Sequence, residues 1–250
     1  MTLLSSKKEA AIVQPLETGS QRLVSVTRTT TLSGNVSYSE AINYEYNNAG
    51  KIIAEGNKKY LRDDKQRIVQ IADLSAGTNN GGTRVYYSDA DENKITYTLC
   101  ASGDDGRDSV VYLHDSNGRL VKTMDYFSYV SSKYSPDTTF LSRYSVFKYD
   151  GNGNIVQVDL FSIDYVNQGV AHCGQDVYSS YDKTINPLYT ADEVRTAEHA
   201  YYGVINTSIN NYACIGPYTK SYEYRTDGRP RSCLVKQNGV EAFKLTFKYN

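Results

Sequence analysis

The chain repeats one short pattern six times, and this repeat constrains the fold more than any other feature of the sequence. Each copy has aromatic or apolar residues at alternate positions, then a polar turn, then a return to basic and aliphatic residues. Alternate side chains of a strand face opposite sides of a sheet, and a short hairpin turn needs a residue that tolerates a positive φ. Each copy therefore predicts a β-hairpin. The copies begin at Tyr44, Tyr60, Tyr86, Tyr112, Phe147 and Tyr222.

The turn residues support these hairpins. In five copies an asparagine or aspartate follows the first strand, where its side chain can accept a hydrogen bond from the backbone two residues later. Gln66 replaces glycine at the bulge position of the second copy, and the third copy is one residue longer and offers Glu92 or Asn93. We expect positive φ at this position, which the other copies fill with Gly50, Gly118, Gly153 and Gly228.

The strands alternate between apolar and polar residues. Phe243, Leu245 and Phe247 share one face of the last strand, while Lys244 and Lys248 lie on the other. This period of two predicts a sheet with one dry face and one wet face. We therefore predict an all-β fold: a large curled antiparallel meander of roughly a dozen or more strands, open and barrel-like, in a single domain over residues 1–250 with a disordered segment at 1–20.

The longest interruption of the pattern covers residues 161–218. It contains the one sequence with clear helical signals, because Thr190 can cap a helix and Glu193 completes a capping box. Apolar residues then recur at helical spacing. We predict a helix at 190–205 that caps one end of the sheet or covers one of its faces.

The composition excludes some classes of protein. A net charge of −1 provides no basic face for nucleic acid. Lys, Glu and Thr fill the wet strand face, whereas a strand facing lipid must be apolar on its outer side. We therefore expect a chain that binds no nucleic acid and does not span a membrane.

Motifs for catalysis or metal binding are weak. Asp89 and Asp91 begin like a calcium loop, but Lys94 stands where glycine is needed and Cys100 where glutamate is needed. The aspartates around Gly103 and Gly106 are typical of an ordinary surface loop. We expect no metal, no cofactor and no enzymatic activity. The pairing of Cys100, Cys173, Cys214 and Cys233 stays open, because they form no C-x-x-C motif and allow several connectivities.

The 24 tyrosines outnumber the 6 phenylalanines, and tryptophan is absent. Most of these tyrosines suit the packing of a half-buried sheet. Those in irregular stretches are candidates for an exposed binding surface, with an envelope glycan as the first ligand and a surface protein as the second. The alternative is an enzyme with its site in residues 161–218, and a third is a structural spacer. The candidate ligand-binding residues are Tyr129, Tyr134, Tyr178 and Tyr181.

Two resemblances follow from these motifs. The repeated Y-x-Y-D/N-x-x-G-R/K-I pattern resembles the tyrosine-aspartate (YD) repeats of Rhs-type proteins. The order of the segments 181–189, 208–211 and 222–231 resembles uncharacterised Bacteroidetes cell-envelope proteins with a porin-like β-sheet. This resemblance implies a periplasmic or surface lipoprotein of unknown function, with no catalytic residues to carry over. No apolar segment follows Lys7 and Lys8, so we expect the leader to be absent from this chain.

Overall fold

The fold is given by a computed structural model, which describes residues 22–31, 37–74, 82–91, 94–102, 106–129, 138–164, 169–184, 186–188, 208 and 210–250. These residues form sixteen β-strands. The strands are β1 (Leu23–Thr31), β2 (Ser37–Tyr46), β3 (Ile52–Glu55), β4 (Lys58–Arg62), β5 (Ile68–Asp73), β6 (Thr83–Tyr87), β7 (Ile95–Ser102), β8 (Gly106–His114), β9 (Leu120–Tyr129), β10 (Thr138–Tyr149), β11 (Ile155–Asp164), β12 (Gly169–Ser179), β13 (Cys214–Ile215), β14 (Tyr218–Tyr224), β15 (Pro230–Gln237) and β16 (Val240–Tyr249).

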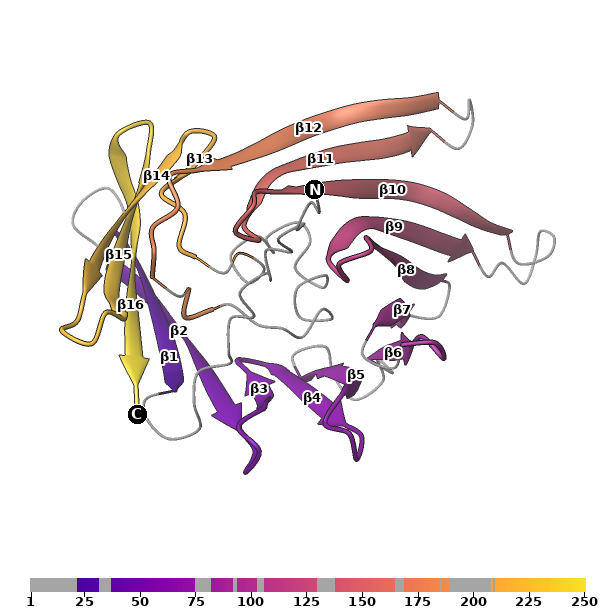
Figure 1. Ribbon diagram of the computed structural model, residues 1–250, viewed down its shortest axis with the longest axis horizontal. Coiled ribbons are helices and arrows are strands. Elements are labelled where there is room, and N and C mark those ends of the chain that lie inside the picture. Colours follow the sequence, from indigo (N-terminus) through magenta and orange to yellow (C-terminus); the bar gives the residue numbers. More distant parts are fainter. Residues whose placement is uncertain are drawn as a thin grey trace, which may run out of the picture.

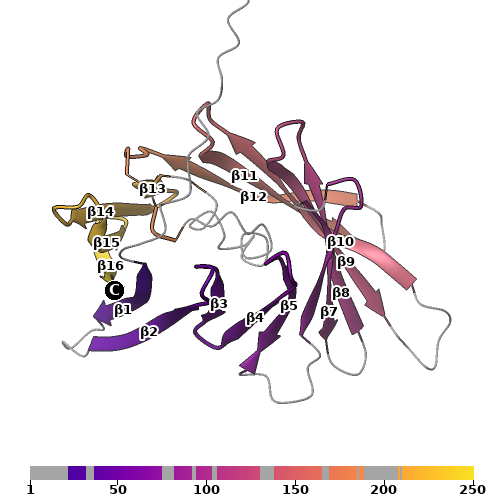
Figure 2. The ribbon, with the colours of Figure 1, turned by 60° about the horizontal axis from the view of Figure 1, so that its bottom comes forward.

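Every strand pairs antiparallel with its neighbours in the chain, and the sheet closes on itself (Figures 1 and 2). Closure occurs between β1 and β16, where Val26 lies opposite Phe247. The predicted all-β, barrel-like antiparallel meander is confirmed, and the barrel is closed. The range 161–218 is less of an interruption than its sequence indicates, because β11 and β12 extend through its first part.

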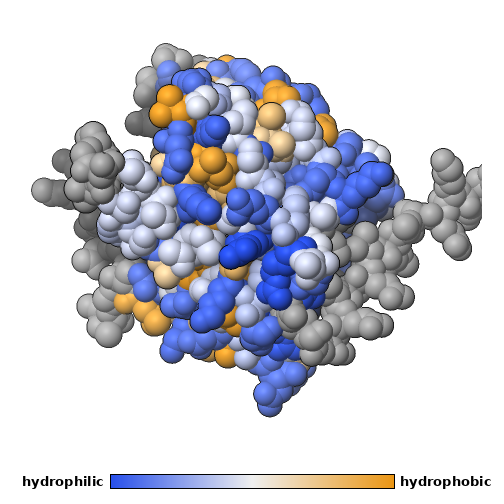
Figure 3. Space-filling view, turned by 90° about the vertical axis from the view of Figure 1, so that its left-hand side faces the viewer, coloured by the Kyte–Doolittle hydropathy of each residue, from blue (hydrophilic) through white to orange (hydrophobic). Residues whose placement is uncertain are grey.

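Much of the inner face of the barrel is buried. Its two buried clusters consist of side chains from alternate strand positions, among them Tyr60, Ile68 and Ile155 in one and Val26 and Phe247 in the other. The strand residues that alternate with these buried side chains face outward. On β16, Lys244 and Lys248 are exposed while Phe247 between them is buried, as the alternation predicts. The side of the molecule that Figure 3 shows is mainly hydrophilic, with scattered hydrophobic side chains.

Five of the hairpin turns have one common geometry. In the turn between β2 and β3, the Gly50 N–H donates to the carbonyl of Asn47 at 2.9 Å. The predicted positive φ is confirmed at Gly50, Gly118, Gly153 and Gly228, with values between 78° and 85°. Gln66 adopts φ of 65° in the equivalent place. The third copy also has a bulge in β6, but its Glu92 and Asn93 lie outside the described residues.

Replacing Gly228 with alanine is expected to lower the free energy of unfolding by about 1 kcal/mol, because an L-residue is strained at φ of +80°. A Cβ at Gly228 would meet no atom within 4 Å, so the loss isolates the backbone strain. Gly151→Ala is the matched control, because Gly151 also has open space but lacks a positive φ. Urea unfolding of both variants checks this prediction, and equal losses would contradict it.

One rim of the barrel is tied together by a repeated side-chain bond. The last residue of an even-numbered strand donates to the carbonyl of the first residue of the strand before it. Tyr46 donates to Leu23 at 2.7 Å, and Tyr149 donates to Leu120 at 2.8 Å. The same bond joins Tyr87 to Ile68, Tyr249 to Pro230 and, through a guanidinium, Arg62 to Ile52. We call these contacts the rim hydrogen bonds.

An arginine covers the tyrosine in several of these contacts. The Cζ of Arg67 lies 4.7 Å from the ring centre of Tyr87, and Arg119 covers Tyr149 in the same way at 5.0 Å. Each arginine also forms an ion pair with the aspartate that begins its turn, 2.6 Å from Asp63 in the first case. Partial burial favours the neutral form of Asp63, but the hydrogen bonds from Arg67 outweigh it and lower the pKa of this carboxyl.

The expectation that the chain does not span a membrane is wrong on the evidence of the fold. The strands close into a barrel, which is the arrangement that lets strands cross a bilayer, because every backbone group inside the sheet is paired. Among the described residues, no helix is both long and apolar enough to cross a bilayer. The predicted helix at 190–205 and the segment 1–20 lie outside the described residues.

Candidate functional site

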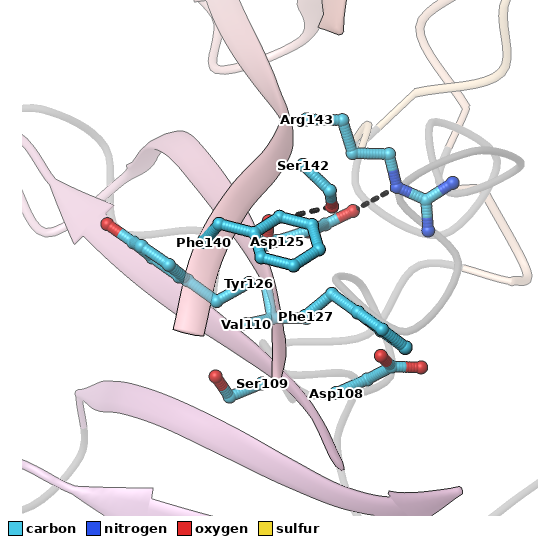
Figure 4. Close-up of a pocket in the computed structure, with 9 residues that line it drawn as sticks. All are labelled: Asp108, Ser109, Val110, Asp125, Tyr126, Phe127, Phe140, Ser142 and Arg143. Carbon is cyan, nitrogen blue, oxygen red and sulfur yellow. Dashed lines mark hydrogen bonds and ion pairs between the residues drawn. The ribbon is translucent and has the colours of Figure 1, made fainter. Parts of the chain in front are cut away.

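A pocket of about 570 Å³ lies on the wall formed by β8, β9 and β10 (Figure 4). The pairing of Asp108 with Phe127 and of Phe127 with Phe140 places these three side chains in one row across the strands. Asp125 and Arg143 are paired one row further along. These residues share the face of buried Tyr112 and Thr123, so the pocket opens on the inner side of the barrel. It lies toward the end opposite the rim hydrogen bonds. The full lining is Asp108, Ser109, Val110, Asp125, Tyr126, Phe127, Phe140, Ser142 and Arg143.

A β-bulge at Ser142 makes this lining possible. Phe140 and Arg143 are three residues apart, so in a regular strand they would face opposite sides of the sheet. The register shifts between Leu141 and Arg143, which leaves Ser142 as the extra residue. The Ser142 hydroxyl donates to the backbone carbonyl of Asp125 at 3.0 Å and holds the bulge in place. Phe140 and Arg143 can therefore both face the pocket.

The charged groups of the pocket differ in whether they form an ion pair. The Nε of Arg143 donates to Asp125, and the two side chains form an ion pair. Asp108 lies two strands away from Arg143, across β9, and its carboxylate forms no hydrogen bond or ion pair within the described part of the chain. The rings of Phe127 and Phe140 lie 5.7 Å apart and tilted by 56° between these two ends. The pocket is therefore apolar in the middle. The Arg143–Asp125 ion pair lies at one end, and the carboxylate of Asp108 lies at the other.

The four tyrosines predicted to bind a ligand fall in different places. Tyr178 is only 6% exposed, so the prediction of an exposed ring is wrong for this residue. It packs edge-on against Tyr212 in the core, because β12 continues to that point as a regular strand. Tyr129 ends β9, two residues beyond Phe127, but its side chain is not described, and Tyr134 lies outside the described residues.

Tyr181 lies half-buried beside the same core. Its hydroxyl donates to the Ile155 carbonyl in the manner of the rim hydrogen bonds and lies 3.1 Å from the Ser208 hydroxyl. Burial raises the pKa of Tyr181 to about 12, although the bond with Ser208 opposes the shift. The structure thus brings Tyr178 and Tyr181 together around Tyr212, as a structural cluster and away from the pocket.

A buried polar network holds the two segments that flank residues 189–207. Asn154 stands where the other four turns of this geometry have arginine or lysine, and it exchanges hydrogen bonds with Asn210 at 3.0 and 3.2 Å. The Asn211 side chain donates to Asp182 and to Thr184. Because these polar groups bind one another, the network acts as an anchor between the rim and the inner segments.

The four cysteines are free thiols, which answers the question of their pairing. His172 and Cys173 are neighbours in the sequence but have different partners: the ring of His172 packs on Phe161, whereas the Cys173 thiol donates to Ser162 at 2.9 Å. Among the described residues, no group of three or more His, Cys, Asp or Glu side chains could hold a metal ion. Asp104 and Asp105 lie outside the described residues, so the absence of a metal stays a prediction.

Sequence reasoning missed the pocket. Asp108 is one of the aspartates around Gly103 and Gly106 that are typical of a surface loop, and no sequence motif marks Phe127, Phe140 or Arg143. A useful signal would have been the odd spacing of Phe140 and Arg143 around a serine in a long alternating strand, because it is what a bulge produces.

Comparison with known proteins supports the fold. No protein-family model and no curated protein matches the chain. A crystal structure of a porin-like protein from Bacteroides vulgatus has a TM-score of 0.56 and 15% identity, and the match covers 92% of this chain and 99% of that one. A porin-like protein from Bacteroides uniformis has a TM-score of 0.57 and 13% identity, with 93% and 99% covered. The chain is thus similar in fold to porin-like barrels, while the likeness to YD repeats stays a prediction.

Proposed function

We propose that the chain is a non-enzymatic module of the cell envelope that binds a glycan in the pocket between β8, β9 and β10. The observation that carries this proposal is the pairing of two phenyl rings with charged groups in one concave site. Sugars pack their C–H faces on aromatic rings and form hydrogen bonds to nearby polar groups. A pocket that is mainly apolar with a few fixed polar groups is typical of a small-ligand site.

The envelope location rests on the similarity in fold to the Bacteroides porin-like proteins, together with the resemblance in segment order. The lipoprotein form belongs to the same proposal. It is tested by labelled fatty acid in the native host, where label on the purified protein supports it and unlabelled protein refutes it.

A glycan array tests the binding function. Phe127→Ala is expected to weaken binding of any glycan hit by about 10-fold or more, because truncating an aromatic side chain at the centre of a site costs more than about 1.4 kcal/mol. Tyr38→Ala is the control, since Tyr38 is an aromatic residue of β2 that is 61% exposed. An array with no hits, or equal binding by Phe127→Ala, would contradict the proposal.

The alternatives are a protein ligand or an enzyme with its site in residues 161–218. Protein binding would appear as a blank array together with specific capture of an envelope protein that Phe127→Ala loses. An enzyme would release product from a bound glycan over time. For a binding module we expect the glycan to be recovered intact after prolonged incubation, which gel filtration of the recovered sugar measures.

A further inference from the structure

The charge balance of the pocket narrows the class of ligand. Asp125 neutralises Arg143 through the Nε bond, so the guanidinium is already paired. Asp108 is exposed and, in the described part of the chain, has no ion-pair partner. The lining carries two carboxylates and one guanidinium, which leaves a net charge of −1. Such a site attracts a cation and not an anion.

The aromatic residues favour the same sign of charge. Phe127 is the cross-strand neighbour of Asp108, and Phe140 is the neighbour of Phe127 on its other side. The faces of phenyl rings carry negative charge density and attract ammonium groups. Figure 4 shows the Asp108 carboxylate beside the Phe127 ring, at the side of the pocket away from Arg143. A carboxylate next to an aromatic ring is a suitable site for an organic ammonium group.

We propose that the pocket binds a glycan that carries a free amino group, that is, a hexosamine without its acetyl group. The inference rests on the proposed glycan binding and adds the ligand class. The ammonium group forms an ion pair with Asp108 and contacts the face of Phe127. The sugar ring packs on Phe127 and Phe140, and its hydroxyl groups accept hydrogen bonds from the free nitrogens of Arg143.

Isothermal titration with two oligosaccharides tests this assignment. Glucosamine oligomers carry amino groups that can be protonated, whereas in N-acetylglucosamine oligomers of equal length the same nitrogen is part of a neutral amide. We expect the glucosamine oligomer to bind at least 10-fold more tightly. Asp108→Asn keeps the shape of the side chain and removes its charge, so it should abolish this preference. Asp64→Asn is the matched control, because Asp64 is an exposed aspartate in the turn between β4 and β5, at the opposite rim.

The outcomes separate this inference from the proposed function. Equal binding of both oligomers, or a preference that survives Asp108→Asn, overturns the ammonium assignment and leaves glycan binding intact. Binding of acidic glycans alone also overturns it. A blank array with no binding of either oligomer refutes both, and binding of a lysine-rich peptide without any sugar would show that the ammonium site serves a protein ligand.

Discussion

Replacing Ile155 with alanine is expected to lower the free energy of unfolding by about 2–5 kcal/mol, the cost of a cavity in a packed core. Ile155 is fully buried at the start of β11, in one cluster with Ile68 and Val158. The surrounding strands are fixed by their pairing on both sides, so the site cannot collapse around the lost methyl and methylene groups. Urea unfolding followed by circular dichroism measures the loss as a shift in midpoint.

Leu113→Ala is the control for this variant. Leu113 is an aliphatic residue of β8, 42% exposed, on the opposite face of the sheet from buried Tyr112. Its truncation is expected to change stability by no more than about 0.5 kcal/mol. A loss at Leu113 as large as that at Ile155 would show that the outer face is also packed against other groups, and the assignment of the buried clusters to the inner face alone would then fail.

Gly82→Ala is expected to open the barrel between β5 and β6. Gly82 has φ of +66°, and a Cβ there would lie 2.4 Å from the carbonyl oxygen of Ile71, a backbone atom that cannot move without its strand. These two strands share only two register pairs, Gln70 with Arg84 and Ile71 with Thr83. We expect a loss of about 2–4 kcal/mol, from backbone strain and the displaced pairing together.

Native-state hydrogen exchange locates this effect. The amide protons of β5 and β6 should exchange faster in Gly82→Ala, while those of β9 and β10 keep their protection. Gly56→Ala is the control, because Gly56 also has positive φ but its Cβ would meet Ile42 at an ordinary 3.7 Å. It should cost only the strain, about 1 kcal/mol. If both variants lose the same stability and exchange uniformly, the steric argument at Ile71 is incorrect.

The hairpins were predictable because their determinants are local. A turn that needs positive φ selects glycine within a few residues of its strands, and even Gln66 could be placed by its position in the repeat. The alternation of apolar and polar residues from Phe243 to Lys248 likewise indicates which face of the strand is buried. These signals survive in the sequence since each depends on neighbours along the chain.

The pocket and the closure depend on residues that are distant along the chain. The closing pair Val26 and Phe247 is separated by almost the whole chain, so nothing near either residue indicates it. The exclusion of a membrane-spanning fold failed for this reason, because it was argued from single strands and closure is a property of all sixteen. The bulge at Ser142 also cannot be predicted from its neighbours in the sequence, since it is defined by the pairing of β10 with β9. The prediction of an exposed Tyr178 ring was wrong because β12 continues as far as Ser179, through a stretch whose sequence lacks the regular alternation.

The rim hydrogen bonds give the two ends of the barrel different capacities for change. At their rim, the turns between β2 and β3, β4 and β5, β8 and β9, β10 and β11, and β14 and β15 all have five residues, and the tyrosines reach their carbonyl acceptors only if the strand ends keep their register. The long connection between β12 and β13 is an exception at this rim. At the pocket end, connections range from the two residues between β3 and β4 to the nine between β5 and β6. A lineage with this scaffold could therefore diversify its ligands by altering loops at one end alone. For protein engineering, foreign peptides are best inserted at the pocket end, because the register of the strands is fixed by the rim hydrogen bonds at the opposite end.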